Sequence, residues 1–388
     1  MQNNRYEVLD GLRGVAAISV MFMHYLQHTQ TPIFKNAYLS VDFFFMLSGF
    51  VLAHSYKERL LNGLSAVDYM GKRLIRLYPM FLISLVIGTP ALFLAIRYGL
   101  SDFPRRSAAV ASLYNLFFTP YFGGYATHNM ASLVAPSQVD ATVGEIFPAN
   151  PAAWSLFFEL LASLFFVSIA RLGRGTLIRI ALISGTAFTA TGLLLAFERH
   201  GTAIYFGGGW GTSNFVSGLF RVTYGFTMGV LLHDLHKFAA HIRPGFGASK
   251  VLGNSISMYL VFVVLVLTPF AVRGAYAMAI IFVVGPLLVF QGASIQNEKP
   301  ILSKAGKFLG WLSYPVYCLH FPIGRLVFMF MPASLQRTMW PVAISAAVTF
   351  LAAAVLAKFV DEPVRQYLTR KFSRAPSKQR ERALVGSA

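Results

Sequence analysis

Two ionisable residues stand near the two ends of the first apolar stretch of the chain, residues 11–25 (GLRGVAAISVMFMHY). Arg13 and His24 are eleven positions apart, which returns a helix at about 100° per residue to within about 20° of the same face. An arginine on that stripe can bind an anion, and a histidine can accept a proton near neutral pH. The alternatives are that Arg13 anchors the helix at the membrane surface and that His24 is an interfacial residue.

Two acidic residues also fall within apolar stretches. Asp42, in SVDFFFMLSGF, would lie at the depth of His24 if the first two segments form a hairpin. A carboxylate beside an imidazole fixes its tautomer, as a general base requires, although Asp42 can instead cap the second helix. Glu159, in WSLFFEL, is predicted one turn inside the fourth span and near the outer face, where a buried carboxylate needs a partner or a proton.

Arg73 and Arg76, in GKRLIRLYP, are three positions apart and therefore share a helix face. Guanidinium groups bind phosphate through paired hydrogen bonds, but a cytoplasmic loop would be basic in any case. His320, in LSYPVYCLHFPI, lies deep in the ninth apolar segment, and both a structural and a catalytic role are open. We predict no metal site at His233, His236 and His241, because Asp234, the carboxylate beside them, is expected to point away from them on the helix.

The composition predicts a membrane protein. Hydrophobic residues make up 56% of the 388 residues and charged residues 12%, with a mean hydropathy of +0.58, which is too apolar for a single globular core. We expect the excess of positive charge, +18, in short loops and at the C-terminal end, where the positive-inside rule places it, and we expect no binding to nucleic acid. The single cysteine, Cys318, excludes an intrachain disulfide.

The fold class predicted is all-α, a polytopic membrane bundle of about ten transmembrane helices. The first apolar segment is expected to be retained rather than cleaved as a signal peptide, and segment 107–118 to form a short interfacial or loop helix. Lys and Arg in alternate loops place both termini in the cytoplasm, and we predict a multi-pass protein of the plasma membrane. The spans are expected at 12–26, 39–55, 77–97, 154–170, 177–197, 213–233, 252–271, 275–293, 308–330 and 340–359.

The domain organisation is predicted to be simple. Residues 1–370 would form one membrane domain, and residues 371–388 a basic cytoplasmic tail without fixed structure. The long connection over residues 98–150 is rich in aromatic residues and Gly, a composition that suits either the membrane interface or sugar rings.

Six of these motifs, in this order, resemble those of integral-membrane acyltransferase family 3, whose members modify sugars of bacterial surface glycans. They cover nearly the whole chain, with Ser40 where the second motif usually has Gly. Each motif alone is weak, but the ordered set is specific. The matching stretches are LDGLRGVAAISVMFMHY, SVDFFFMLSGF, RLIRLYP, WSLFFEL, LSYPVYCLHFPI and DEPVR.

The resemblance implies an acyltransferase that uses acyl-CoA, usually acetyl-CoA, as donor substrate and holds no bound cofactor. Phosphates of CoA would bind at the cytoplasmic side to the three arginines Arg13, Arg73 and Arg76. His24 would act as general base, with Asp42 orienting it and Glu159 binding the acceptor or tuning the pair. The expected partners are acyl-CoA, a carbohydrate or lipid-linked glycan acceptor, and membrane lipids.

Two alternatives stay open at the level of the sequence. One is an acyltransferase acting on a small molecule or a lipid, since the acceptor would be chosen by variable outer loops. The other is a polytopic glycan or lipid transporter without acyl transfer, which internal repeats would favour, and no repeat is obvious.

Overall fold

The computed structural model describes residues 6–27, 29, 33–123, 144–198, 204–242, 253–268, 273–295 and 299–373. These residues form helices and no strand, apart from one isolated bridge between Glu145 and Gly211. The helices are α1 (Glu7–Leu26), α2 (Ser40–Leu61), α3 (Ala66–Arg97), α4 (Arg105–Leu116), α5 (Ala153–Ile169), α6 (Arg174–Glu198), α7 (Phe215–Ile242), α8 (Ser255–Leu267), α9 (Arg273–Ala279), α10 (Gly285–Ser294), α11 (Pro300–Phe330), α12 (Trp340–Leu356) and α13 (Glu362–Ser373). Short π-helical turns join α9 to α10 and α12 to α13.

The all-α class is confirmed, and each of the ten predicted spans overlaps a helix or the joined pair α9–α10, although residues 252 and 269–271 of the span 252–271 lie outside the described residues. Within the described residues, six helices are long and apolar enough to cross a membrane. Two shorter apolar helices, α5 and α8, fall below that length. A count of about ten spans therefore stays a prediction. Segment 107–118 lies mostly within the short helix α4, as expected.

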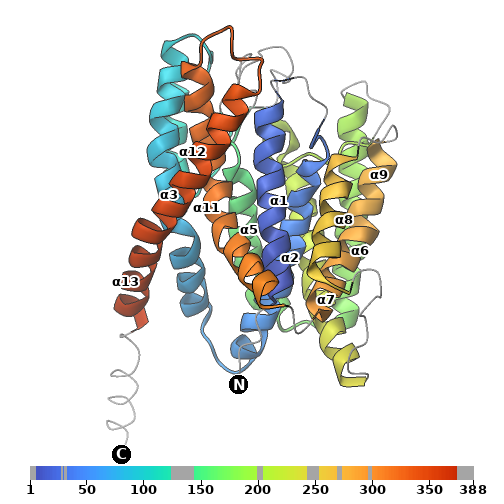
Figure 1. The fold of residues 1–388 in the computed structure, drawn as a ribbon. Helices are drawn as coiled ribbons and strands as arrows, with labels where there is room; N and C mark the ends of the chain where they lie inside the picture. Colours follow the sequence, from blue (N-terminus) through green and yellow to red (C-terminus); the bar gives the residue numbers. More distant parts are fainter. Residues whose placement is uncertain are drawn as a thin grey trace, which may run out of the picture.

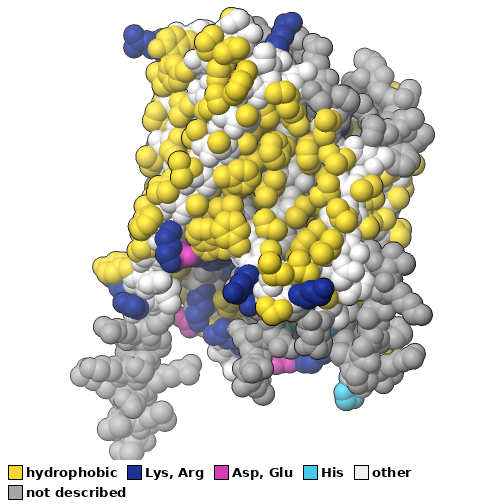
Figure 2. All heavy atoms as spheres, in the orientation of Figure 1, with side chains coloured by type: hydrophobic (Ala, Val, Ile, Leu, Met, Phe, Trp, Pro, Cys, Tyr) yellow, Lys and Arg dark blue, Asp and Glu magenta, His cyan; other side chains and the backbone are white. Residues whose placement is uncertain are grey.

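The long helices run side by side in one bundle (Figure 1). Helix α1 packs against α11 and α2, and α7 packs against α2 and α6. Helix α1 starts and α13 finishes at the same end of the bundle, which we call the termini end (Figure 1). Figure 2 shows a broad band of hydrophobic side chains across the helices, with acidic and basic side chains at the termini end and further basic side chains at the opposite end. Such a band is typical of a surface that faces lipid.

The connection before α5 does not run over the surface but enters the bundle. Residues 144–152 are buried and mostly not helical. The Asn150 amide nitrogen donates to Ser84 Oγ of α3 and to the main-chain oxygen of Cys318 in α11, both at 2.9 Å. Pro322 has no N–H to offer to that oxygen four residues earlier, so Asn150 supplies the missing donor. The rest of the predicted loop includes residues 124–143, which lie outside the described residues.

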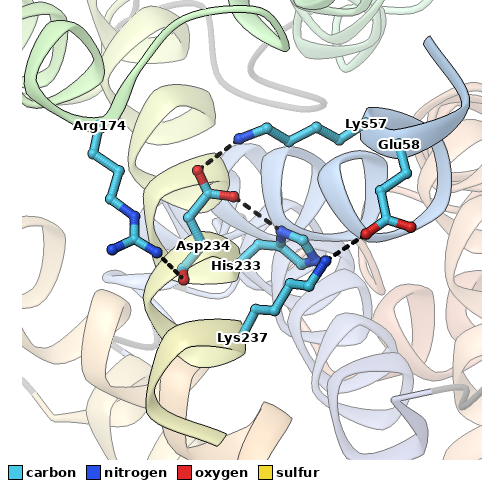
Figure 3. A network of polar contacts seen from close by, with 6 residues as sticks. All are labelled: Lys57, Glu58, Arg174, His233, Asp234 and Lys237. Carbon is cyan, nitrogen blue, oxygen red and sulfur yellow. Dashed lines mark hydrogen bonds and ion pairs between the residues drawn. The ribbon is translucent and has the colours of Figure 1, made fainter. Parts of the chain in front are cut away.

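Charged residues at the termini ends of α2 and α7 form a network (Figure 3). Lys57 Nζ lies 2.6 Å from one oxygen of Asp234, and His233 Nδ1 lies 3.4 Å from the other. Lys237 pairs with Glu58, so the network ties α7 to α2. The sequence led us to expect Asp234 to point away from the histidines, and its contact with His233 corrects this. Helix α13 continues to Ser373, and the remainder of the predicted tail, 374–388, lies outside the described residues.

Glycines allow α2 and α7 to approach closely. A Cβ atom placed on Gly49 would lie 2.1 Å from the main-chain oxygen of Phe226, and one on Gly229 would lie 2.0 Å from that of Met46. Real Cβ atoms do not come so near to a carbonyl oxygen, so alanine at either position would push the two helices apart. Small residues at such contacts are a common basis of helix association in membranes.

We therefore expect Gly229→Ala to lower the thermal unfolding temperature of the detergent-solubilised protein, with a cost of about 1–3 kcal/mol typical of overpacking. Gly71→Ala is the matched control, because a Cβ atom on Gly71 in α3 meets nothing within 4 Å. Equal unfolding temperatures for the two variants would contradict the close contact between α2 and α7.

Candidate active site

A cavity opens among α1, α2, α3, α5 and α11, at the level of the early turns of α1 and α3. It has a volume of about 800 Å³, including its opening, and we call it the arginine cavity. It brings together four of the six site residues predicted from the sequence, while His24 and Asp42 are absent from its described lining. The polar lining residues are Arg13, Ser48, Arg73, Arg76, Ser155, Glu159, Ser313, Tyr314 and Tyr317.

Arg73 and Glu159 form an ion pair on one wall of this cavity. Arg73 Nη2 lies 2.6 Å from Glu159 Oε1, and Ser48 Oγ donates to the same oxygen at 3.2 Å. The placement of Glu159 near the outer face is therefore wrong, because Arg73 lies in the early turns of α3 at the termini end. The physical reason is the buried segment 144–152. Because the chain has already entered the bundle at residues 144–152, α5 begins inside the bundle and not at its surface. Glu159 therefore lies deeper than hydropathy predicts.

The other two arginines differ in how their charge is balanced. Arg13 pairs with Asp10 at 2.9 Å and donates through Nε to Ser313 Oγ at 3.1 Å. Arg76 lies over the ring of Tyr314, 5.6 Å from its centroid. Among the residues that the structure describes, Arg76 makes no hydrogen bond or ion pair. It is thus the guanidinium of the cavity that is best able to receive an external anion.

His24 lies beyond the arginine cavity and stacks on a second histidine. Its ring centroid is 5.3 Å from that of His320 in α11, with the planes inclined by 27°. Since Arg13 also contacts α11, the predicted shared face of Arg13 and His24 is confirmed. Tyr317 stands between the cavity and the histidines. Its hydroxyl lies 2.6 Å from Ser155 Oγ, and its ring centroid lies 5.6 Å from that of His320.

Asp42 has a basic partner that sequence reasoning missed. Both of its oxygens accept from Arg221 of α7 at 2.7 Å, and the side chains of Asp42 and Arg221 are almost completely buried. Arg221 also donates to the main-chain oxygens of Gly208 and Tyr38 and lies 5.3 Å from the ring centroid of Trp154. An arginine within the apolar window 213–233 was the signal available in the sequence. The orienting of His24 by Asp42 stays a prediction.

The buried ion pair of Asp42 and Arg221 predicts how the stability of the protein responds to substitution of either residue. Asp42→Leu and Arg221→Met should each lower stability strongly, because a lone buried charge left behind costs about 3–5 kcal/mol. The double variant should recover much of that loss, since an apolar pair leaves no charge uncompensated. Thermal unfolding of the four proteins in one detergent measures this. Additive losses would show that the two side chains do not depend on each other.

Comparison with known proteins agrees with the motifs. The Acyltransferase domain family matches residues 6–358. "Protein 2 in picA locus" of Rhizobium radiobacter is 33% identical over 161 residues, covering 41% of this chain and 79% of that protein. ORF330 of Acidianus two-tailed virus, named as a candidate acetyltransferase, is 26% identical over 332 residues, covering 84% of this chain and 86% of that protein. No solved structure matches significantly. The chain belongs to acyltransferase family 3, and it is an acyltransferase.

Proposed function

We propose that the protein moves an acyl group, most simply acetyl, from acyl-CoA to a hydroxyl of a cell-surface or lipid-linked carbohydrate. The arginine cavity is the observation that carries the donor half of the proposal. It gathers three guanidinium groups at the termini end of the bundle, and one of them, Arg76, forms no ion pair with a described residue. The phosphate groups of CoA are anions that such a cluster would bind.

The position of the arginine cavity at the termini end supports a route by which acyl-CoA enters from the cytoplasm. In the bacterial inner membrane with both termini cytoplasmic, the arginine cavity would face the cytoplasm, where acyl-CoA is made. The pantetheine arm would extend from the arginines past Ser155 and Tyr317, which line the cavity on the side of the histidines. His24 lies eleven residues beyond Arg13 along α1, a rise of about 16 Å.

The chemistry proposed for the far end is general base catalysis. His24 takes the proton of the acceptor hydroxyl while the hydroxyl oxygen attacks the thioester carbonyl. The new C–O bond forms, the C–S bond breaks, and the CoA thiolate leaves with the proton. The roles that the resemblance implies for Asp42, to orient His24, and for Glu159, to bind the acceptor or tune the pair, stay predictions, and the two carboxylates are bound by Arg221 and Arg73.

A carbohydrate acceptor is supported by the family resemblance. A small-molecule or lipid acceptor stays the alternative for the second substrate. The alternative of a transporter without acyl transfer is no longer supported, because the chain belongs to an acyltransferase family. Comparing acylated glycans and small metabolites between a deletion strain and its parent would separate the two kinds of acceptor.

Release of free thiol from acetyl-CoA by the purified protein, with a crude extract of lipid-linked sugars, tests the reaction. We expect release by the wild type and at least a 100-fold lower rate for His24→Ala, within the range typical of a lost general base. Thermal unfolding of His24→Ala serves as the folding control. Transfer by His24→Ala at the wild-type rate would show that His24 is not the base.

The donor site makes a separate prediction. Arg76→Gln should raise the KM for acetyl-CoA by about tenfold, because a hydrogen bond to a charged group contributes about 1.5–3 kcal/mol. Arg179→Gln, an exposed arginine of α6 outside the cavity, should leave the KM unchanged and is the matched control. An unchanged KM for both variants would exclude the phosphate site at Arg76.

A further inference from the structure

The orientation of His320 is fixed by its own helix. Its Nδ1 atom lies 2.8 Å from the main-chain oxygen of Tyr317 and 3.2 Å from that of Val316. Carbonyl oxygens only accept hydrogen bonds, so the hydrogen of the neutral imidazole is on Nδ1. The lone pair is then on Nε2, and His320 presents a hydrogen-bond acceptor at that atom.

That acceptor is buried without a partner. His320 is 0% exposed, and its Nε2 atom has no hydrogen-bond partner among the described residues. Buried polar atoms in folded proteins are nearly always satisfied, so one that is left over calls for an explanation, and a catalytic role is one such explanation. The Nε2 atom therefore points to a donor that reaches it at another stage of the reaction cycle.

The surroundings of His320 identify the donor. The His24 ring stacks on it at 5.3 Å, and the rings of Tyr317, Phe321 and Tyr25 complete the contacts, with centroids 5.6, 6.3 and 6.5 Å away. The Tyr25 hydroxyl is engaged by the main-chain oxygen of His320 and by Thr349, and the Tyr317 hydroxyl by Ser155. An imidazole that gains a proton is a strong donor, so protonated His24 is the group best placed to reach Nε2.

We propose that His320 is a positioning residue for His24 and accepts a hydrogen bond at Nε2 from the ring N–H of His24 that faces away from the acceptor hydroxyl. This inference rests on the proposed function, in which His24 is the base. The hydroxyl proton passes to His24, the C–O bond forms and the C–S bond breaks. The imidazolium of His24 then carries a proton on each ring nitrogen: one N–H donates to His320 Nε2, and the CoA thiolate takes the proton from the other. His320 thereby fills the role for which the sequence suggested Asp42, whose two oxygens are bound by Arg221.

Three substitutions at His320 test this. His320→Asn keeps an amide donor near the position of Nδ1 and removes the acceptor at Nε2, and we expect kcat to fall about 100-fold with an unchanged KM for acetyl-CoA. His320→Gln and His320→Met form a matched pair of similar size, because only glutamine places an oxygen acceptor near the position of Nε2. We expect kcat of the glutamine variant to exceed that of the methionine variant at least tenfold, a difference that mere packing would not produce.

The outcomes separate the two proposals. If His24→Ala is inactive while His320→Asn keeps the wild-type kcat, or if the glutamine and methionine variants turn over equally, the role of His320 is overturned. If His24→Ala transfers at the wild-type rate, the base assignment itself fails. Should His320→Asn not fold, the ratio of kcat between the glutamine and methionine variants decides the question.

Discussion

Main-chain polar groups that water cannot reach must find partners within the protein, and the bundle around α11 depends on this requirement. Pro322 leaves the main-chain oxygen of Cys318 without its helical donor, and Asn150 supplies one. Arg325, buried in the same helix, donates to the main-chain oxygen of Pro148. Both contacts reach the non-helical segment before α5. The proline-containing helix α11 and the irregular segment 144–152 thus stabilise each other. Their contacts hold the segment inside the bundle, and this sets the depth at which α5 begins.

That depth determines which charges meet. Because α5 starts inside the bundle, Glu159 reaches Arg73 and becomes part of the arginine cavity. Asp42 and Arg221 balance each other away from this cavity and link α2 with α7. These two ion pairs join helices, whereas Arg76 lies beside the ring of Tyr314 and forms no ion pair with a described residue.

Much of the fold was predictable, because apolar windows report helices directly and the eleven-residue spacing of Arg13 and His24 does define one face. The errors came from tertiary structure. Hydropathy assumes that a chain crosses from one surface to the other, so it could not reveal that residues 144–152 enter the bundle before α5. The pairing of Asp42 with His24 was inferred from depth alone and stays a prediction, while the ion pair of Asp42 with Arg221 was missed because Arg221 comes from a helix far along the chain. The tautomer of His320 follows from the short distances between its Nδ1 atom and two main-chain oxygens, and the spacing of residues in the sequence does not predict such distances.

The hydrogen bond between Ser155 and Tyr317 has a consequence for the membrane as an insulator. A polar passage joining the arginine cavity to the histidine pair would give protons and small ions a path across the bundle. The paired hydroxyls and the Tyr317 ring stand at this junction, and the aromatic ring of Phe44 packs against Tyr317 at 5.4 Å. These contacts fill the junction between the arginine cavity and the histidine pair, so a bound acyl donor that passes this point would have to displace them, and without a donor they would narrow such a path.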